Sequence, residues 1–389
     1  MTRKNVVLTL NLGSTSLKAS LFDRSTVGTW GAPSISQSWP FQFAPDPQKF
    51  AMPANQAAGD GVHFSASMAS LISELDGWMA ANNAEPEVVI HRIVHGGTLE
   101  GPCRLDSKNI AILSRFAEWA PDHQAPALAL VDAATATWPS ASQVAVFDTD
   151  WHRTMPDLTR TFTLSKAIRS EGLHRYGFHG IAYQSVWRQF RELQQDAMNR
   201  RVVCAHLGGG SSLCAVQGGR SIDTTMGLTP MDGLPMATRC GSLDPGVVLH
   251  LLRGERFSVS SLDVELNQNS GMLGLSGTTG DMQRLLATDS SDARLAVAIF
   301  VHRVAQGIVS MATTLGGIDD LVFSGGIGTH SSQIRSAVVE KLQWIGLRID
   351  SEANDAKRQS VGAETSAARI LVLDAHEDRE LAAASRPAP

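Results

Sequence analysis

The chain has 389 residues, of which 43% are hydrophobic and 18% are charged, and its formal net charge is −5 at pH 7. This length is too great for one ordinary core and fits two domains of similar size. Because no long basic run offsets the negative charge, the composition excludes nucleic acid and an anionic membrane surface as partners.

The cysteines and the hydropathy predict a cytoplasmic protein. The four cysteines show no metal-ligand spacing, which favours free thiols in a reducing compartment. The apolar run near the N-terminus is too short for a secretory signal. No run of about 18 apolar residues occurs in the sequence, so we expect no membrane span.

The first predicted element is a β-hairpin. Residues 6–10 and 17–22 are apolar runs separated by a small polar turn at 11–16. The same order of strand, Gly/Ser turn and strand recurs at residues 201–216. This echo indicates a duplicated domain, although two hairpins can also resemble each other by chance.

The later elements alternate between helices and strands. Helices are predicted where apolar residues recur at helical spacing, in residues 67–80 (Met68, Leu71, Ile72, Leu75, Met79), 296–314 (Ile299, Val304, Ile308, Met311) and 334–345 (Ile334, Val338, Leu342, Ile345). Short buried strands are predicted at residues 88–90, 144–147 and 321–323. The alternation predicts an α/β fold with mixed sheets. We expect an aperiodic insertion at residues 28–53 and a frayed tail after residue 385.

Three Gly-rich turns, each following a predicted strand, are candidate phosphate sites: residues 11–16, 206–212 and 325–328. Glycines let backbone N–H groups approach phosphate oxygens, and the hydroxyls of Ser14 and Ser16 add donors. Lys18 lies close enough in sequence to reach the first turn. The chain lacks GxxxxGK[ST], which excludes a P-loop. Each turn alone is also compatible with a purely steric role.

Ionisable residues at predicted strand ends form a second candidate set. Arg92 lies in a predicted loop at 91–97, Asp148 follows the strand at 144–147, and His179 and Arg239 lie beside glycines. Guanidinium groups match carboxylate and phosphate oxygens bidentately. Phosphoryl transfer needs positioning and charge neutralisation more than covalent chemistry, so two arginines, a histidine and a carboxylate are a sufficient set.

Six ordered segments together resemble the acetate kinase family over essentially the whole chain. They are residues 11–18 (NLGSTSLK), 91–97 (HRIVHGG), 146–149 (VFDT) with His152 and Met155-Pro156, 176–180 (YGFHG), 206–208 (HLG), and 226–230 (MGLTP) leading to Thr238-Arg239. The resemblance implies two ribonuclease H-like domains of duplicated topology, of the actin ATPase type, with a nucleotide cleft between them.

The same resemblance implies two domains with separate tasks. An acid-binding domain would span residues 1–150, with the C-terminus from about 380 packing back on it, and a nucleotide-binding domain would span 151–379. The implied reaction is direct in-line transfer from ATP to acetate, with Mg²⁺ (or Mn²⁺) as cofactor. A homodimer is also implied.

The site residues implied by the resemblance fall into four groups. The catalytic group is Asp148, His179, Arg239 and Arg92. The acid-binding group is Arg92, Val94, Phe178 and Pro230. The metal ligands are Asn11 and Glu377. The nucleotide contacts are Lys18, Ser14, Ser16, His206, Leu207, Gly208, Gly209, Gly210, Asp281, Met282, Gln283, Gly326, Ile327, Gly328, Thr329 and His330.

The chain departs from the family pattern at several positions. Asp122 stands where a pocket leucine is usual, Gln124 where an asparagine is usual, and Tyr183 where a histidine is common. The adenosine side differs at Gly209, at Gln283 and at Thr329-His330. These differences leave the acyl preference and the nucleotide preference open.

Three functions remain open from the sequence. The first is an acetate kinase, with propionate as a close second substrate because one methylene changes binding by only about 1–3 kcal/mol. The second is a kinase for butyrate or a branched acid, and the third is an actin-like nucleotide switch without an acid substrate. Arg92, Arg239, His179 and Asp148 favour an enzyme. Replacing either arginine with alanine is expected to reduce turnover and to leave the fold intact.

Overall fold

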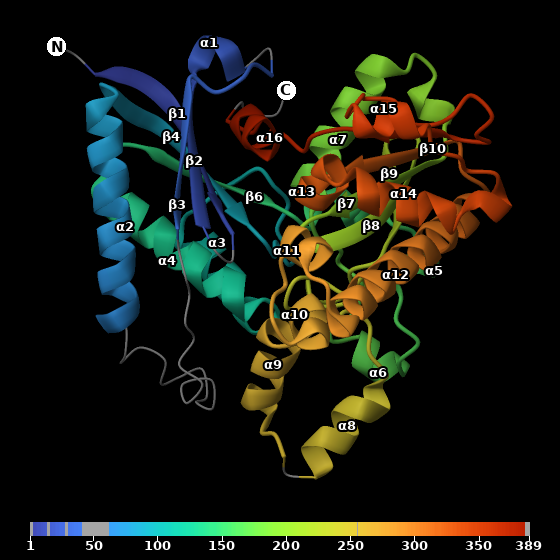
Figure 1. The fold of residues 1–389 in the computed structure, drawn as a ribbon. Coiled ribbons are helices and arrows are strands. Elements are labelled where there is room, and N and C mark those ends of the chain that lie inside the picture. The colour runs from blue at the N-terminus through green and yellow to red at the C-terminus, as the bar shows by residue number, and fades with distance from the viewer. Residues whose placement is uncertain (1–2, 14–15, 28–29, 41–61, 255, 386–389) are drawn as a thin grey trace. The chain divides into compact units, whose positions relative to one another are not determined.

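The computed structural model describes residues 3–13, 16–27, 30–40, 62–254 and 256–385. The chain forms two compact units: unit 1 is Met1–Asp150 with His376–Pro389, and unit 2 is Trp151–Ala375. Each unit is built on one mixed β-sheet flanked by helices (Figure 1).

The sheet of unit 1 has the strand order β3-β2-β1-β4-β6-β5. Its strands are β1 (Lys4–Leu12), β2 (Ser16–Asp23), β3 (Ile35–Pro40), β4 (Ala84–Ile93), β5 (Cys103–Arg104) and β6 (Ser142–Phe147). Strands β1, β2 and β3 form an antiparallel meander, whereas β4 pairs in parallel with β1 and β6 pairs in parallel with β4. The predicted hairpin is therefore confirmed.

The helices of unit 1 lie on both sides of this sheet. They are α1 (Arg24–Val27), α2 (Val62–Ala81), α3 (Ser107–Ser114), α4 (Pro121–Thr137) and α16 (Glu377–Ala383). The five apolar residues predicted to face inward from α2 are all buried, which confirms that helix. They pack against the odd-numbered residues of β2, which share one face of the sheet, and against Leu8, Leu10 and Leu12 of β1. Helix α16, from the C-terminal segment, contacts β1, β2 and β4.

The sheet of unit 2 has the strand order β11-β10-β7-β8-β9. Its strands are β7 (Val202–Leu207), β8 (Ser211–Gln217), β9 (Arg220–Thr224), β10 (Asp320–Ser324) and β11 (Arg369–Val372). Here β7, β8 and β9 form the antiparallel meander, β10 pairs in parallel with β7, and β11 pairs in parallel with β10.

The two sheets thus repeat one topology: an antiparallel meander followed by two parallel strands on the side of its first strand. In unit 1 the parallel strands are β4 and β6, and in unit 2 they are β10 and β11. The connections from β1 to β4 and from β7 to β10 each contain a long helix, α2 or α12, as a parallel crossover requires. The predicted α/β fold with a duplicated topology is confirmed.

Helices cover both faces of the unit 2 sheet because side chains alternate along each strand. The odd-numbered residues Val203, Ala205 and Leu207 of β7 pack with α12 (Ser291–Leu315) and α14 (Ser332–Glu340). The even-numbered Val202 and Cys204 pack with α7 (Gly180–Leu193).

The other helices of unit 2 are short. They are α5 (Asp157–Arg160), α6 (Lys166–Arg169), α8 (Pro245–Arg253), α9 (Val259–Gln268), α10 (Gly271–Ser276), α11 (Met282–Ala287), α13 (Gly325–His330) and α15 (Ser351–Asp355). In the described part of the chain, α12 alone has the length and hydropathy of a membrane span, and ten of its side chains are buried in unit 2.

Four sequence predictions need correction. Residues 35–40 of the predicted aperiodic insertion form β3, and 325–328 begin helix α13 rather than a turn. The helix predicted at 334–345 ends at Glu340, with a separate 3₁₀ turn at Gln343–Ile345. Ile299 of α12 is only partly buried. The tail after residue 385 lies outside the described residues.

Candidate functional site

In unit 1 successive side chains of a strand point to opposite faces of the sheet, and polar side chains lie on the face away from α2. Because Leu8, Leu10 and Leu12 pack in the core with α2, Asn11 points to the other face. Asn11 lies opposite Lys18 in the β1–β2 register. Helix α16 contacts the sheet here and begins with Glu377.

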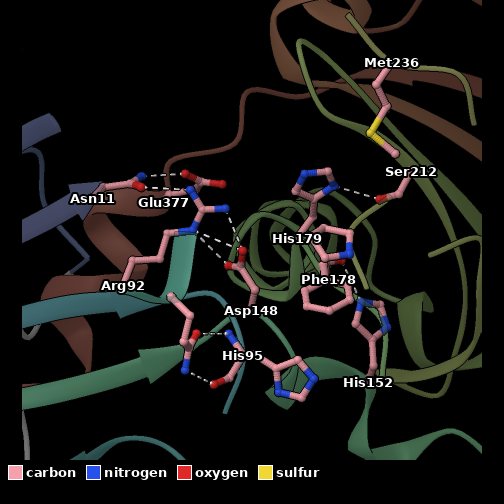
Figure 2. A network of polar contacts seen from close by, with 12 residues as sticks. Asn11, Arg92, His95, Asp148, His152, Phe178, His179, Ser212, Met236 and Glu377 are labelled. Carbon is pink, nitrogen blue, oxygen red and sulfur yellow. Dashed lines mark hydrogen bonds and ion pairs between the residues drawn. The ribbon is translucent and has the colours of Figure 1, made fainter. Parts of the chain in front are cut away.

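A hydrogen-bonded network joins the ends of three strands to the start of α16 (Figure 2). Asn11 Nδ2 donates to Glu377 Oε2 at 2.6 Å, and Arg92 donates from one terminal nitrogen to Asn11 Oδ1 at 3.0 Å. Arg92 also donates to Asp148, from Nε at 3.1 Å and from its other terminal nitrogen at 2.6 Å. The structure thus brings together four of the predicted residues.

Burial makes the Arg92–Asp148 pair sensitive to the loss of either partner. The Asp148 side chain is 1% exposed and that of Arg92 is 13% exposed. Burial of the guanidinium acts to lower the pKa of Arg92, but the nearby Asp148 and Glu377 carboxylates outweigh it and raise the pKa above its usual value. Arg92 is therefore a permanent cation. It lies in β4, which runs to Ile93, so its predicted loop position is wrong.

The first Gly/Ser turn is described only in part. Ser14 lies outside the described residues, and Ser16 begins β2. Lys18 is half-exposed, and its Nζ lies 3.5 Å from Asp378 Oδ2. In this structure Lys18 is therefore paired with α16.

Val94 follows β4 and is buried, and the next residue is held by an amide from α4. Gln124 Oε1 accepts from the His95 N–H at 3.1 Å, and Gln124 Nε2 donates to the His95 carbonyl at 2.9 Å (Figure 2). Gln124 thus fixes the backbone beside Val94. Asp122 lies in the first turn of α4, where a negative side chain stabilises the helix.

In unit 2 the same alternation gathers polar side chains on the sheet face that α7 covers. Among the cross-strand pairs on the face of Cys204 and Cys214, His206 and Ser212 are the pair nearest the turn of the β7–β8 hairpin. His179 precedes α7 in a left-handed conformation with φ 62°, and Tyr183 lies one turn into the helix. The His179 and His206 ring centroids are 4.7 Å apart.

Arg239 comes from the loop between β9 and α8, and it approaches the same hairpin turn. A Cβ added to Gly210 would lie 3.1 Å from His179 Nε2 and 3.7 Å from an Arg239 terminal nitrogen. That nitrogen donates to the Pro230 carbonyl at 3.2 Å. The glycine therefore leaves room between two hydrogen-bond donors, a histidine and an arginine, at the turn of the hairpin.

The second and third Gly-rich segments lie side by side because β7 and β10 are adjacent strands. A Cβ on Gly208 would lie 3.7 Å from the Gly326 nitrogen. Gly325 has φ 75°, and a Cβ there would lie 2.6 Å from the Leu207 carbonyl oxygen, so this position needs glycine. The strands thus bring the predicted segments 206–210 and 326–330 together.

A buried arginine binds carbonyl groups at the C-terminal end of α13, and no feature of the sequence predicted this contact. Arg335 is fully buried in α14 and donates to the carbonyls of Gly328 and Thr329, at 2.8 Å each. Its Nε donates to Asn354 Oδ1 at 2.7 Å. An isolated arginine in a helical pattern resembles a surface charge, so only the structure reveals this role.

The residues predicted to contact the nucleotide differ in the burial of their side chains. The Leu207 and Met282 side chains are part of the unit 2 core. Asp281 caps α11 by accepting from the Arg284 N–H at 2.8 Å, and Gln283 and His330 are exposed.

His152, noted in the sequence only as part of a motif, supports the segment that carries His179. Its Nε2 donates to the Phe178 carbonyl at 2.9 Å, and its Nδ1 lies 2.8 Å from Ser221 Oγ (Figure 2). Burial lowers the pKa of His152 to about 4. Phe178 and Pro230 are buried in unit 2, whereas Val94 belongs to unit 1.

The oxygen ligands in unit 1 suit a hard divalent cation. Mg²⁺ prefers carboxylate and amide oxygens and takes few of them from the protein when phosphates and waters complete its shell. Asn11 Oδ1 and the Glu377 carboxylate are such oxygens, and the two side chains are held together by the hydrogen bond from Asn11 Nδ2 to Glu377 Oε2. Within the described ranges, no group of three or more His, Cys, Asp or Glu side chains forms a metal cluster, so a dedicated protein cage is absent there.

Comparison with known proteins gives one consistent family. Residues 6–383 match the Acetokinase family. An acetate kinase of Methylocella silvestris is 36% identical over 387 residues, covering 97% of this chain and 96% of the relative. An acetate kinase of Nostoc punctiforme is 39% identical over 82% of this chain and 80% of the relative.

Solved structures agree with the sequence relatives. A propionate kinase from Francisella tularensis aligns with a TM-score of 0.83 and 28% identity, covering 98% of both chains. An acetate kinase of Porphyromonas gingivalis aligns with a TM-score of 0.78 and 25% identity, covering 97% of this chain and 98% of the other.

Proposed function

The chain belongs to the acetokinase family, and we propose that it transfers the γ-phosphoryl group of Mg²⁺-bound ATP to acetate, giving acetyl phosphate and ADP. The observation that carries the proposal is the convergence of His179 and Arg239 on the space beside Gly210. A transferring phosphoryl group needs donors for its equatorial oxygens, and a bare glycine turn leaves room for them.

Each unit has its own task in this proposal. Unit 2 binds the nucleotide through the adjacent segments 206–210 and 326–330 and through residues 281–283, with Ser14, Ser16 and Lys18 of unit 1 on the phosphate side. Unit 1 supplies Arg92 for the acid carboxylate, and Val94, Phe178 and Pro230 are the proposed contacts of the acyl group. Two observations support this assignment of tasks to the units. The two Gly-rich segments of unit 2 lie side by side, and Arg92 of unit 1 is a largely buried permanent cation.

Asn11 and Glu377 hold the magnesium ion in the proposed site. When bound, Mg²⁺ neutralises phosphate charge. Asp148 orients Arg92 through paired hydrogen bonds, so the guanidinium meets the acid in a fixed plane. His179 donates to the phosphoryl oxygens in the transition state, and Arg239 stabilises the charge that develops on them.

Propionate is the second candidate acid, because the Francisella tularensis relative by structure is named a propionate kinase. One methylene changes the binding free energy of a small acid by only about 1–3 kcal/mol, so acetate and propionate are close competitors. We also propose that the enzyme acts in the cytoplasm and as a homodimer, as the family resemblance implies.

Steady-state ADP formation with acetate, propionate, butyrate or no acid tests this function. We expect acid-dependent turnover, and we expect Arg239→Ala to lower kcat by about 100-fold or more because it removes a donor from the transferring group. Arg220→Ala is the matched control, since Arg220 is an exposed arginine on β9. ADP formation that is equal with and without acid would contradict the proposal.

A further inference from the structure

A chain of three side chains in unit 2 ends at His179. His179 Nδ1 lies 2.8 Å from Ser212 Oγ, and Ser212 Oγ lies 2.6 Å from the hydroxyl oxygen of Tyr183. Figure 2 shows the first of these bonds, with Ser212 on the Nδ1 side of the imidazole. Neither Ser212 nor Tyr183 is among the residues to which the proposed reaction assigns a role.

The fold fixes the middle residue of this series and the residue at its far end. Ser212 is paired with His206 of β7 in the sheet, and its side chain is fully buried. Tyr183 is also fully buried, and its ring packs edge-on against His152. His179 and Tyr183 lie four positions apart at the start of α7, so their side chains share one face of the helix.

The direction of the hydrogen bonds follows from the protons available. In the part of the chain that the structure describes, Ser212 is the hydrogen-bond partner of the Tyr183 hydroxyl. A buried hydroxyl that donates to nothing is costly, so Tyr183 donates to Ser212. Burial raises the pKa of Tyr183 well above its usual value, which keeps that proton in place. The single Ser212 proton then goes to His179 Nδ1.

An imidazole that accepts at Nδ1 carries its proton at Nε2 when it is neutral. Nε2 is the atom nearest the space beside Gly210, 3.1 Å from the position of an added Cβ. The three side chains therefore set both the orientation of the ring and which nitrogen is the donor. In the reversed arrangement Ser212 would donate to the tyrosine oxygen, and the tyrosine proton would be left without an acceptor among the described residues.

We propose that Tyr183 and Ser212 are positioning residues that hold His179 as its Nε2–H tautomer, with the donor directed at the transferring phosphoryl group. The effect of this tautomer on catalysis rests on the proposed function. The tautomer itself follows from the hydrogen bonds of Ser212 to His179 and Tyr183 alone.

The first test is a measurement on the unaltered protein. Long-range ¹⁵N–¹H spectra of the protein labelled in its histidine rings distinguish Nε2–H from Nδ1–H imidazole, and a His179→Gln variant assigns the His179 signals. We expect Nε2–H. A His179 ring protonated at Nδ1 in the neutral state would overturn the inference, whatever the variants do.

The second test removes one oxygen atom. Tyr183→Phe keeps the packed ring and frees the Ser212 hydroxyl to accept from Nδ1, so we expect a mixture of tautomers and about a tenfold lower kcat with little change in KM. Ser212→Ala should lower kcat at least as much, and Ser212→Thr should restore part of it. Tyr176→Phe is the matched control, because the chain has only two tyrosines.

The outcomes separate this inference from the proposed function. Unchanged kcat and an unchanged His179 spectrum in a folded Tyr183→Phe protein would overturn the positioning role. If no acid is phosphorylated by the unaltered protein, the proposed function fails, while the tautomer measurement still reports on Tyr183 and Ser212. If His179→Gln keeps normal turnover, His179 does not act in the reaction. The hydrogen bonds from Tyr183 and Ser212 then have no effect on catalysis either.

Discussion

Arg92 shows how the environment of one residue changes the expectation drawn from its sequence context. In a segment that ends in two glycines, Arg92 was predicted to be a loop residue whose loss would leave the fold intact. In the structure it lies in β4 and is the ion-pair partner of Asp148, which is almost completely buried. Its removal would leave an uncompensated buried carboxylate, so activity and stability are coupled at this position.

We therefore expect Arg92→Ala to lower the free energy of unfolding by about 3 kcal/mol, as well as turnover. The double variant Arg92→Met with Asp148→Asn removes both charges and should recover most of that stability without recovering activity. Urea unfolding followed by circular dichroism measures the first effect, and ADP formation measures the second. If Arg92→Ala unfolds at the same urea concentration as the unaltered protein, the buried pair does not stabilise unit 1.

Much of the candidate site was predictable at this scale, because catalytic groups follow strand ends and glycines. Arg92, Asp148 and Asn11 do converge, and so do His179 and Arg239. The supporting residues were not predictable. Arg335 and Gln124 act through backbone carbonyl and amide groups, and a sequence does not show which backbone groups a distant side chain will reach.

At the scale of elements, α10 links the glycines of unit 2 to the loop that carries Arg239. Gly271 begins this helix with φ 58°, and an added Cβ would lie 2.3 Å from the Met236 carbonyl oxygen and 2.6 Å from that of Arg239. Gly277 ends the helix with φ 67°, but nothing lies within 4 Å of an added Cβ. The two glycines differ in their surroundings and not in their backbone.

This difference gives a matched pair of variants. Gly277→Ala should cost about 1–2 kcal/mol of stability, which is the intrinsic penalty of a left-handed residue with a side chain. Gly271→Ala adds a collision with two carbonyls, so it should cost more and displace Arg239, with kcat lowered at least about tenfold. Urea unfolding and ADP formation on both variants provide the comparison. Equal effects of the two substitutions would mean that the Arg239 loop does not depend on Gly271.

The element predictions failed where local pattern and tertiary pairing disagree. Strand β3 is exposed at every residue except Trp39 and only half of its residues are apolar, and it is a strand because β2 offers it an edge to pair with. Helix α13 was read as a turn because of its glycines, yet it follows β10 directly and is held at its end by Arg335. Tertiary contacts decided both cases.

For the whole molecule, two buried histidines predict how stability depends on pH. Burial lowers the pKa of His91 to about 4, and that of His152 to about 4 as well. An unfolded histidine has a pKa of about 6.5, so below that pH the unfolded chain binds protons that the folded chain does not. Stability is therefore fully present above about pH 6.5 and falls as the pH decreases toward 4.

We expect each of these histidines to remove about 2 kcal/mol of stability between pH 7 and pH 5. Urea unfolding at several pH values in this range measures the slope. His91→Leu should reduce the slope of stability against pH by the His91 contribution. The variant is also less stable overall, because Gln143 loses its hydrogen-bond partner. His302→Leu on the exposed side of α12 is the control. A slope that is the same in the His91→Leu variant would rule out His91 as a source.

The duplicated topology was the best predicted feature of the molecule. The echo between the two hairpins followed from apolar runs separated by Gly/Ser turns, and the two sheets repeat the same strand order. In the structure Asn11 and His206 occupy matching places near the ends of β1 and β7, with Lys18 and Ser212 opposite them. That match explains why each unit presents its polar residues at one end of its sheet.

Trapping of acyl phosphate as a hydroxamate distinguishes an acid kinase from a nucleotide switch. The protein is supplied with Mg²⁺-ATP and acetate, propionate, butyrate or no acid, with and without a chelator. We predict a trapped product that is strongest with acetate or propionate and is abolished by the chelator. Robust ATP hydrolysis with no trapped product from any acid would contradict the account and would identify a nucleotide switch instead of a kinase.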